Sequence, residues 1–330
     1  MRIVTPLHEV SGSRARIEPV PDGSPRPLWS VMIPTFHCAR HLGETLLGVL
    51  SQAPGADQMQ IEVVDDASTL DDPESVVRSL AEGRVEFVRQ PANVGHIRNF
   101  ATCLQRARGH YVHLLHGDDF VLPGFYAALH RGFESDPAIG AAFCRWMVVD
   151  EKSRRLSVVE PLQSNPGPLT DAAARLAEEQ RIVTPSIAVR RTAYERLGGF
   201  DDRLLCAEDW EMWVRIAASH TIWYEPAPLA AYRTRPDSNT GRHFRLAGEL
   251  GYNRKAITMF GSYLPADRAP SIMRTARRTY ARTALSNARD FAREGDAQAV
   301  RAHLRAALRF SRSPRVLLQA ARLLAGSARP

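Results

Sequence analysis

The 330-residue sequence has few cysteines and no long apolar run. Its four cysteines are far apart and form no C-x-x-C pair, which argues against a structural zinc ribbon and against a disulfide framework. No apolar stretch approaches the roughly 20 residues that span a bilayer, and residues 1–27 contain no apolar core of a signal peptide. We therefore expect a cytoplasmic protein.

Two common nucleotide-binding motifs are also missing. The turn after the first predicted strand reads IPTFHCARHLGE, without the G-x-G-x-x-G of a Rossmann dinucleotide site. No Gly-Lys-Ser or Gly-Lys-Thr ends a phosphate-binding loop anywhere in the chain. Neither a dinucleotide-binding site nor a P-loop is expected.

What the sequence does have is an ordinary globular composition with a basic surplus. Apolar residues make up 44% and charged residues 24%, as in soluble globular proteins. The net charge of +7 favours anionic partners. Arginine is dense from Arg242 onward, and we interpret this density first as the solvated face of arginine-rich helices. No nucleic-acid partner is expected.

Apolar patterning from Trp29 onward alternates between strand and helix. This alternation predicts an α/β fold with a mostly parallel central sheet and helices on both faces. The predicted helices lie within 41–52, 71–83 and 95–109. The predicted strands are WSVMIP (29–34), IEVVDD (61–66), VEFVRQ (85–90) and HYVHLLH (110–116).

Polar groups follow three of these strands, at the edge of the sheet where ligands of such folds bind. Acidic side chains from two strand ends are expected to face one crevice. A divalent cation, or hydrogen-bond donors of a ligand, would relieve their repulsion. The groups are Pro34 and Thr35 after the first strand, Asp65 and Asp66 after the second, and His116, Gly117, Asp118 and Asp119 after the fourth.

Five segments in this order resemble the family 2 glycosyltransferases of the GT-A fold. They are WSVMIPTFHCARHLGETLLGVLSQ, IEVVDDAST, NVGHIRNF, RGHYVHLLHGDDFVLPGF and GGFDDRLLCAEDWEMWVRIA, and the likeness runs from about Trp29 to Gly241. The resemblance implies a GT-A, Rossmann-like sheet. It also implies transfer of a sugar from a nucleotide-diphosphate sugar, with inversion and with bound Mn²⁺ or Mg²⁺.

The resemblance divides the chain into three regions. Residues 1–27 form a proline-rich lead-in segment, and 28–244 form the GT-A domain, with a nucleotide half at 28–122 and an acceptor half at 123–244. Residues 245–330 read as a helical C-terminal appendage. We expect these helices to pack on the catalytic domain. Peripheral attachment to the inner face of the membrane is the alternative, because basic amphipathic helices bind anionic lipid.

The resemblance places nucleoside contacts at the ends of the first two strands and in the NVGHIRNF segment. Asp66 is expected to accept the N3 hydrogen of uracil or thymine, which favours a UDP- or dTDP-sugar. The alternatives are that Asp66 opens a helix and that the asparagines only shape a turn. The candidate nucleotide-sugar-binding residues are Pro34, Thr35, Asp65, Asp66, Asn93, Asn99 and His116.

The segment HGDD stands where the family has its Asp-x-Asp metal motif, with His116 in place of the first Asp. Asp118 is expected to bind the metal against the diphosphate, because Mg²⁺ often takes only one or two protein carboxylates. His116 is expected to bind a ribose hydroxyl or the metal, and imidazole suits Mn²⁺ better than Mg²⁺. Asp119 is expected to cap the following turn.

On the acceptor side, the segment EDWEMWVRIA matches the family's Glu-Asp helix start. The resemblance makes Asp209 the general base, with Glu208 and Trp210 beside the acceptor. The alternative is that the two acids only complement a helix dipole. The family's Tyr-Arg-x-His stretch departs here, because Arg235 replaces the histidine; His243 is a candidate substitute.

The predicted function is therefore glycosyl transfer to a glycan, a lipid-linked acceptor or a small molecule. Two alternatives come from other classes. His116 and Arg235 suggest a pseudoenzyme that binds a nucleotide sugar without turnover. A nucleotidyltransferase is disfavoured, because it would need a glycine-rich, basic phosphate loop after the first strand.

Overall fold

The structure, a computed structural model, describes residues 13–81, 83–235 and 238–327. Within these ranges the chain forms two compact units, each built from segments that are not consecutive in sequence. The first unit contains the described residues up to Thr170, together with Ile182–Arg203 and Ser219–Thr234. The second contains Asp171–Arg181, Leu204–Ala218 and the described residues from Arg235 onward. Residues 1–12 of the predicted lead-in and 328–330 of the predicted helical region lie outside the described residues.

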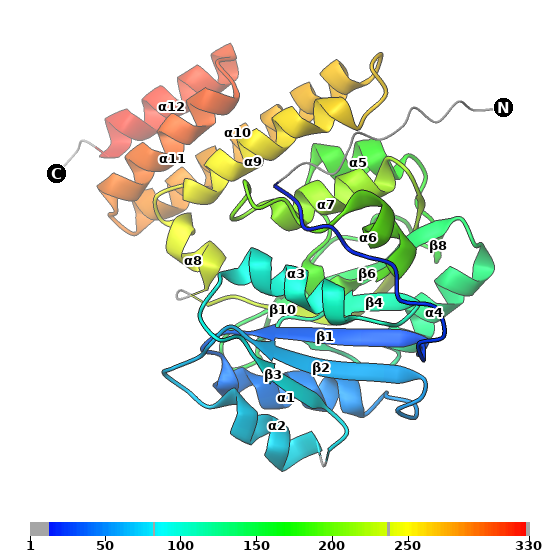
Figure 1. Ribbon diagram of the computed structural model, residues 1–330. Helices are drawn as coiled ribbons and strands as arrows, with labels where there is room; N and C mark the ends of the chain where they lie inside the picture. The colour runs from blue at the N-terminus through cyan, green and yellow to red at the C-terminus, as the bar shows by residue number, and fades with distance from the viewer. Residues whose placement is uncertain (1–12, 82, 236–237, 328–330) are drawn as a thin grey trace. The chain divides into compact units, whose positions relative to one another are not determined.

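A ten-stranded sheet forms the centre of the first unit, in the order β3-β2-β1-β4-β9-β6-β10-β5 with β7 beside β6 and β8 beside β10 (Figure 1). The long ladders, which join β1 to β2 and β4, β2 to β3, and β6 to β10, are parallel. The antiparallel ladders contain only two or three residue pairs each. The predicted mostly parallel sheet is confirmed. The strands are β1 (Trp29–Thr35), β2 (Met59–Asp65), β3 (Glu86–Arg89), β4 (Tyr111–Leu114), β5 (Phe120–Val121), β6 (Ile139–Val149), β7 (Arg155–Val158), β8 (Gly167–Pro168), β9 (Ile187–Arg190) and β10 (Thr221–Arg233).

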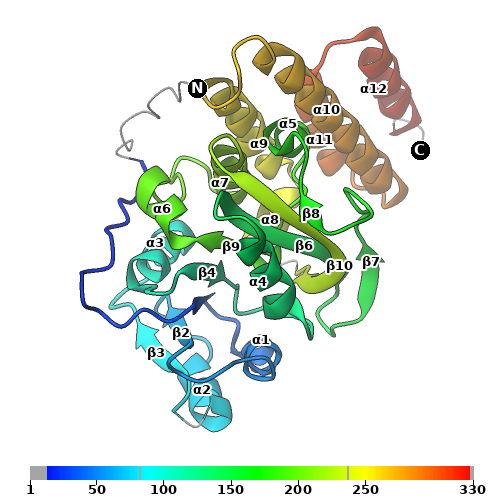
Figure 2. The same ribbon diagram turned by 90° about the vertical axis from the view of Figure 1, so that its right-hand side faces the viewer.

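Helices cover both faces of this sheet (Figures 1 and 2). Strands β1 and β2 are buried at every position, and a strand buried on both sides needs cover on both faces. Leu42, Leu46 and Val49 recur on one side of α1 and share a buried core with Leu129 of α4. The helices of the unit are α1 (Ala39–Leu50), α2 (Pro73–Ala81), α3 (His96–Arg106), α4 (Phe125–Ser135), the 3-10 turn η1 (Thr184–Ser186) and α6 (Arg191–Leu197).

The described part of the lead-in segment packs along the first unit. Ile17 is buried, with only 1% of its surface exposed. The backbone N–H of Gly199 donates to Ala15 O (2.8 Å), and the Arg191 guanidinium donates to Glu18 O (2.7 Å). Residues 13–18 are therefore part of the folded unit.

The second unit is helical. Its helices α10, α11 and α12 lie side by side (Figure 2). Within the described ranges, no helix combines the length and apolarity needed to cross a membrane. The helices are α5 (Ala172–Glu178), α7 (Glu208–Ala217), α8 (Asn239–Phe244), α9 (Gly248–Met259), the 3-10 turn η2 (Phe260–Ser262), α10 (Ala269–Arg293), α11 (Ala297–Phe310) and α12 (Pro314–Ser327).

Candidate functional site

The turn that joins β4 to β5 lies against the carboxyl end of β1. The N–H of Gly117 donates to Pro34 O (3.1 Å). A Cβ atom at position 117 would lie 2.5 Å from Thr35 Cγ2, which is closer than real Cβ contacts, and 3.0 Å from Cys38 Sγ, which is unusually tight. Glycine is therefore required at position 117 for the turn to approach the strand this closely.

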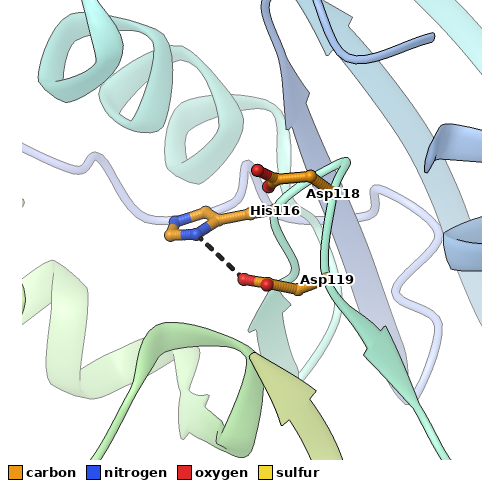
Figure 3. Close-up of side chains that lie close together, drawn as sticks. All are labelled: His116, Asp118 and Asp119. Carbon is orange, nitrogen blue, oxygen red and sulfur yellow. Dashed lines mark ion pairs between the residues drawn. The ribbon is translucent and has the colours of Figure 1, made fainter. Parts of the chain in front are cut away.

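This turn brings together His116, Asp118 and Asp119 (Figure 3). One potential ligand atom from each side chain lies within 4.8 Å of the others. The His116 ring stacks on Phe100, with the ring centroids 5.2 Å apart and the planes inclined by 15°. Carboxylate oxygens and an imidazole nitrogen at this spacing suit a divalent cation such as Mn²⁺. The cluster can therefore hold a metal ion.

Asp119 is the buried member of the cluster, with 1% of its surface exposed. Burial raises the pKa of its carboxyl above the ordinary value, and the nearby His116 ring, with Nδ1 3.4 Å from Asp119 Oδ2, opposes this rise. Asp119 Oδ1 accepts from the backbone N–H of Arg233 (2.7 Å), and Asp119 O accepts from Thr45 Oγ1 (2.7 Å). The carboxylate thus joins the turn to the end of β10 and does not cap the turn after it.

Arg233 holds the same turn from the side of β10. Its side chain is almost fully buried, and its guanidinium donates to Asp118 O (2.7 Å), Asp150 O (2.9 Å) and Ser153 Oγ (3.0 Å). It also pairs with the carboxylate of Glu44 in α1. A buried arginine with this many partners fixes the backbone position of Asp118.

The end of β2 supplies two further buried carboxylates, of which Asp65 is fully used inside the protein. Asp65 Oδ1 accepts from Ser68 Oγ (2.6 Å) and Thr35 Oγ1 (3.3 Å). Asp65 Oδ2 accepts from Ser68 N (3.0 Å) and from Arg89 Nε (2.9 Å). These contacts identify Asp65 as the residue that organises the loop after β2.

Asp66 holds the turn that contains the Asn-x-Gly sequence. Its two carboxylate oxygens accept from the backbone N–H groups of Val94 (2.7 Å) and Gly95 (3.0 Å). Its own N–H donates to Thr35 O (2.9 Å), so the ends of β1 and β2 stay together. A carboxylate oxygen can accept more than one hydrogen bond, which leaves Asp66 with further accepting capacity.

The two candidate asparagines differ in their surroundings. Asn99 is buried, its amide donates to Val64 O (2.9 Å), and its Oδ1 accepts from Gln90 (3.2 Å). Asn93 is exposed, and its Oδ1 accepts from Gly95 N (3.2 Å). Asn99 therefore ties α3 to β2, whereas Asn93 remains reachable from solvent.

Asp209 and Glu208 belong to the second unit, in the first turn of α7. Asp209 Oδ2 accepts from Gln180 Nε2 (2.9 Å), and Asp209 Oδ1 accepts from the N–H of Trp210 (2.7 Å). Asp209 is half-buried, while Glu208 is buried. The Gln180 amide and the N–H of Trp210 thus help to orient the Asp209 side chain.

Trp210 lies in the core of the second unit. Its indole donates to Leu176 O (2.6 Å), and its ring centroid lies 4.9 Å from those of Phe260 and Tyr280. This packing accounts for the tryptophan as a core residue. Its role beside the acceptor stays a prediction.

Several residues that shape the turn were not among the predicted site residues. Arg233, Thr45 and Phe100 reach it from β10, α1 and α3, which are distant in sequence. Nothing local to HGDD points to these partners. The role of Gly117 could be predicted from the sequence, because a glycine between a strand and two aspartates indicates that the backbone passes close to another segment.

Comparisons with known proteins agree with this architecture. A family model described as glycosyl transferase family 2 matches residues 30–198, just over half of the chain. A protein of Mycobacterium tuberculosis is 27% identical over 228 residues, which cover 66% of this chain and 70% of its own. An uncharacterized glycosyltransferase of Mycoplasma pneumoniae is 24% identical over 222 residues, which cover 64% and 70%.

Solved structures share the fold at low sequence identity. TarS 1-349 of S. aureus in complex with UDP-GlcNAc has a TM-score of 0.66 at 15% identity, over 91% of this chain and 88% of that one. The mannosyltransferase PcManGT from Pyrobaculum calidifontis, in complex with GDP-Man and Mn²⁺, has a TM-score of 0.60 at 21% identity, over 94% and 83%. The chain has the GT-A fold, is a glycosyltransferase, and belongs to glycosyl transferase family 2.

Proposed function

We propose that this glycosyltransferase is inverting and metal-dependent, and that it uses a UDP- or dTDP-sugar. The observation that carries the proposal is the His116, Asp118 and Asp119 cluster, which lies at the same end of β1 as Asp66. A nucleoside at β2 and a diphosphate at the turn after β4 would then share one edge of the sheet. The Mn²⁺ in PcManGT and the UDP-GlcNAc in TarS support this reading by analogy.

In this proposal, Asp118 and His116 hold the metal, and Asp119 sets their positions. A bound divalent cation would supply positive charge against the diphosphate that leaves. Arg233 keeps the turn in place through its bond to Asp118 O. These residues prepare the turn before the donor arrives, so that little reorganisation accompanies the reaction.

Asp66 is proposed to recognise the nucleobase. Its carboxylate, already fixed by two backbone N–H groups, would accept the N3 hydrogen of uracil or thymine. Pro34, Thr35 and Asn93 are proposed to lie beside the nucleoside. Asp65 and Asn99 are proposed to act indirectly, since their polar groups hold the neighbouring loops.

Asp209 is proposed as the general base, on the resemblance of its helix start and on its half-buried, amide-bound carboxylate. The acceptor oxygen attacks the anomeric carbon, and the bond from that carbon to the diphosphate breaks. The acceptor proton passes to Asp209, and the nucleoside diphosphate leaves. Attack opposite the leaving group inverts the anomeric carbon.

Isothermal titration with UDP and CDP, with and without Mn²⁺, tests the nucleotide part. Because N3 of cytosine has no hydrogen to donate, we expect UDP to bind the wild type more tightly than CDP. The Asp66→Ala variant should lose this preference. If the variant still prefers UDP to CDP as strongly as the wild type does, Asp66 does not contact the base. This conclusion holds even if the substitution loosens the turn at residues 93–95 and both nucleotides bind more weakly.

Donor hydrolysis tests the catalytic part. The wild type should release nucleoside diphosphate from at least one UDP- or dTDP-sugar in the presence of Mn²⁺, and chelation with EDTA should stop the release. Tight binding of a nucleotide sugar without hydrolysis or transfer would instead favour the non-catalytic alternative.

A further inference from the structure

A groove of about 850 Å³ in the second unit has four arginines among its eleven described lining residues. It lies between α10, the α11–α12 connection and the first turns of α12. Arg278, Arg282 and Arg289 contribute from α10, and Arg315 contributes from α12. None of the lining residues that the structure describes is acidic. Its volume is within the range of about 300 to 1,000 Å³ that is common for small-molecule sites.

The arginines of α10 share one side of the helix, because positions 278, 282 and 289 are separated by four and seven residues. Like charges at that spacing disfavour an isolated helix. Elsewhere in this unit arginines pair with acids, as Arg293 does with Asp290 (2.6 Å). Among the described residues, Arg278, Arg282 and Arg315 have no carboxylate within ion-pair distance, and Arg289 contacts only the neutral amide of Gln319 (3.1 Å). The positive charge of the groove is therefore uncompensated within the described chain.

We propose that this groove binds a phosphate or diphosphate group, at a site made of residues other than those of the nucleotide-sugar site. One guanidinium group can donate two parallel hydrogen bonds to the oxygens of a phosphate. It is also more weakly hydrated than an ammonium group, so arginine suits a partly enclosed anion site. The hydroxyls of Ser286, Ser311 and Ser313 add hydrogen-bond donors to the same lining. Buried Leu285 and Val316 give the groove an apolar floor.

The phosphate group can belong to a soluble compound or to the headgroup of an anionic lipid, and the chemistry of recognition is the same. The probes are inorganic pyrophosphate, titrated in EDTA so that metal-dependent binding is suppressed, and vesicles of phosphatidylcholine with 30% phosphatidylglycerol. The test variant is Arg278→Gln with Arg282→Gln. The matched control is Arg274→Gln with Arg277→Gln, which removes the same charge from exposed positions of α10 outside the groove.

We expect pyrophosphate to bind the wild type and the control alike, and to bind the groove variant at least tenfold more weakly. Co-sedimentation with the anionic vesicles that the groove variant alone loses would assign the site to a lipid headgroup. Pyrophosphate binding without co-sedimentation would assign it to a soluble phosphate compound. Equal losses in both double variants, or no binding of either probe by the wild type, would overturn the proposal, because the arginines would then act only as a solvated surface.

Discussion

The acidic turn of the first unit and the acidic helix start of the second unit are built in opposite ways. Asp118 and Asp119 are held by residues from distant strands and helices, with Arg233 and Thr45 as anchors. Asp209 is held by contacts within the second unit, which include the Gln180 amide and the N–H of Trp210 in its own helix. A turn whose backbone is fixed by long-range contacts suits a preorganised binding site, whereas the half-buried Asp209 carboxylate is the group proposed to act on the acceptor. The following variants test this division of roles.

The largest effect is expected for Asp209→Asn. The substitution keeps the shape of the side chain but removes its basicity, and a general base contributes about 10² to 10⁴ in rate. Transfer to an acceptor found by screening should fall by that factor, while nucleotide affinity, measured by isothermal titration, should stay within a few fold. Glu179→Gln, which removes an exposed acid of the same unit, is the control. Wild-type transfer by Asp209→Asn would place the base elsewhere.

Arg233→Met should be the most damaging substitution to stability. It removes the guanidinium donor from Asp118 O and Asp150 O, and a hydrogen-bonding group left unpaired away from water costs about 1 to 3 kcal/mol. Chemical denaturation measures this loss, and Mn²⁺-dependent donor binding should weaken with it. Arg154→Gln removes an exposed partner of Asp150 and should cost no more than about 1 kcal/mol. Equal stability of the two variants would show that Arg233 does not hold the turn.

Asp118→Asn should weaken Mn²⁺-dependent donor binding by at least about 10- to 100-fold, because replacing even a residue that only supports a metal ligand typically costs this much. Turnover should fall with it, in contrast to Asp209→Asn, where only turnover falls. Titrations in EDTA provide the control, because the metal-independent affinity of the variant and the wild type should then agree. A deficit that persists in EDTA would mean that Asp118 contacts the nucleotide and not the metal.

The sequence predicted the parts of the fold that depend on local patterning. The four strands from Trp29 to Leu114 and the helices between them were predicted, because each has its own apolar period and its own turn residues. The two-residue strands β5 and β8 are too short to show a period, and the prolines at 226 and 228 interrupt the period of the long β10. The strands β6 and β7 were not identified either.

The residues of the candidate site also fall into those that local sequence predicts and those that it does not. Asp118 and Asp66 could be proposed from strand ends, because the carboxyl ends of parallel strands meet at one edge. Arg233 could not be assigned as an anchor of Asp118, since 115 positions separate them and only the folded sheet brings them together. The long-range contacts that hold the acidic turn are thus the part that sequence patterning does not reveal.

The smallest effect is expected in the second unit, at the buried carboxyl of Glu249, which has few hydrogen-bond partners. Burial raises the pKa of this carboxyl to about 7, and its Oε2 has no hydrogen-bond partner among the described residues. Since the folded pKa lies above the unfolded value of 4.5, the stabilising effect of the proton is complete below pH 4.5 and is lost as the pH rises through 7.

Glu249→Gln imitates the protonated acid, so it should match the wild type at pH 5 and exceed it at pH 8.5. The pKa shift corresponds to a gain of at most about 3 kcal/mol in the free energy of unfolding at pH 8.5. Relaxation around the carboxylate reduces the expected gain to about 1 kcal/mol, or roughly 2 °C in Tm. Thermal denaturation at both pH values measures it, with Glu294→Gln, an exposed acid of the same unit, as the control. The same difference between Glu249→Gln and the wild type at both pH values would show that proton binding at Glu249 is not coupled to folding.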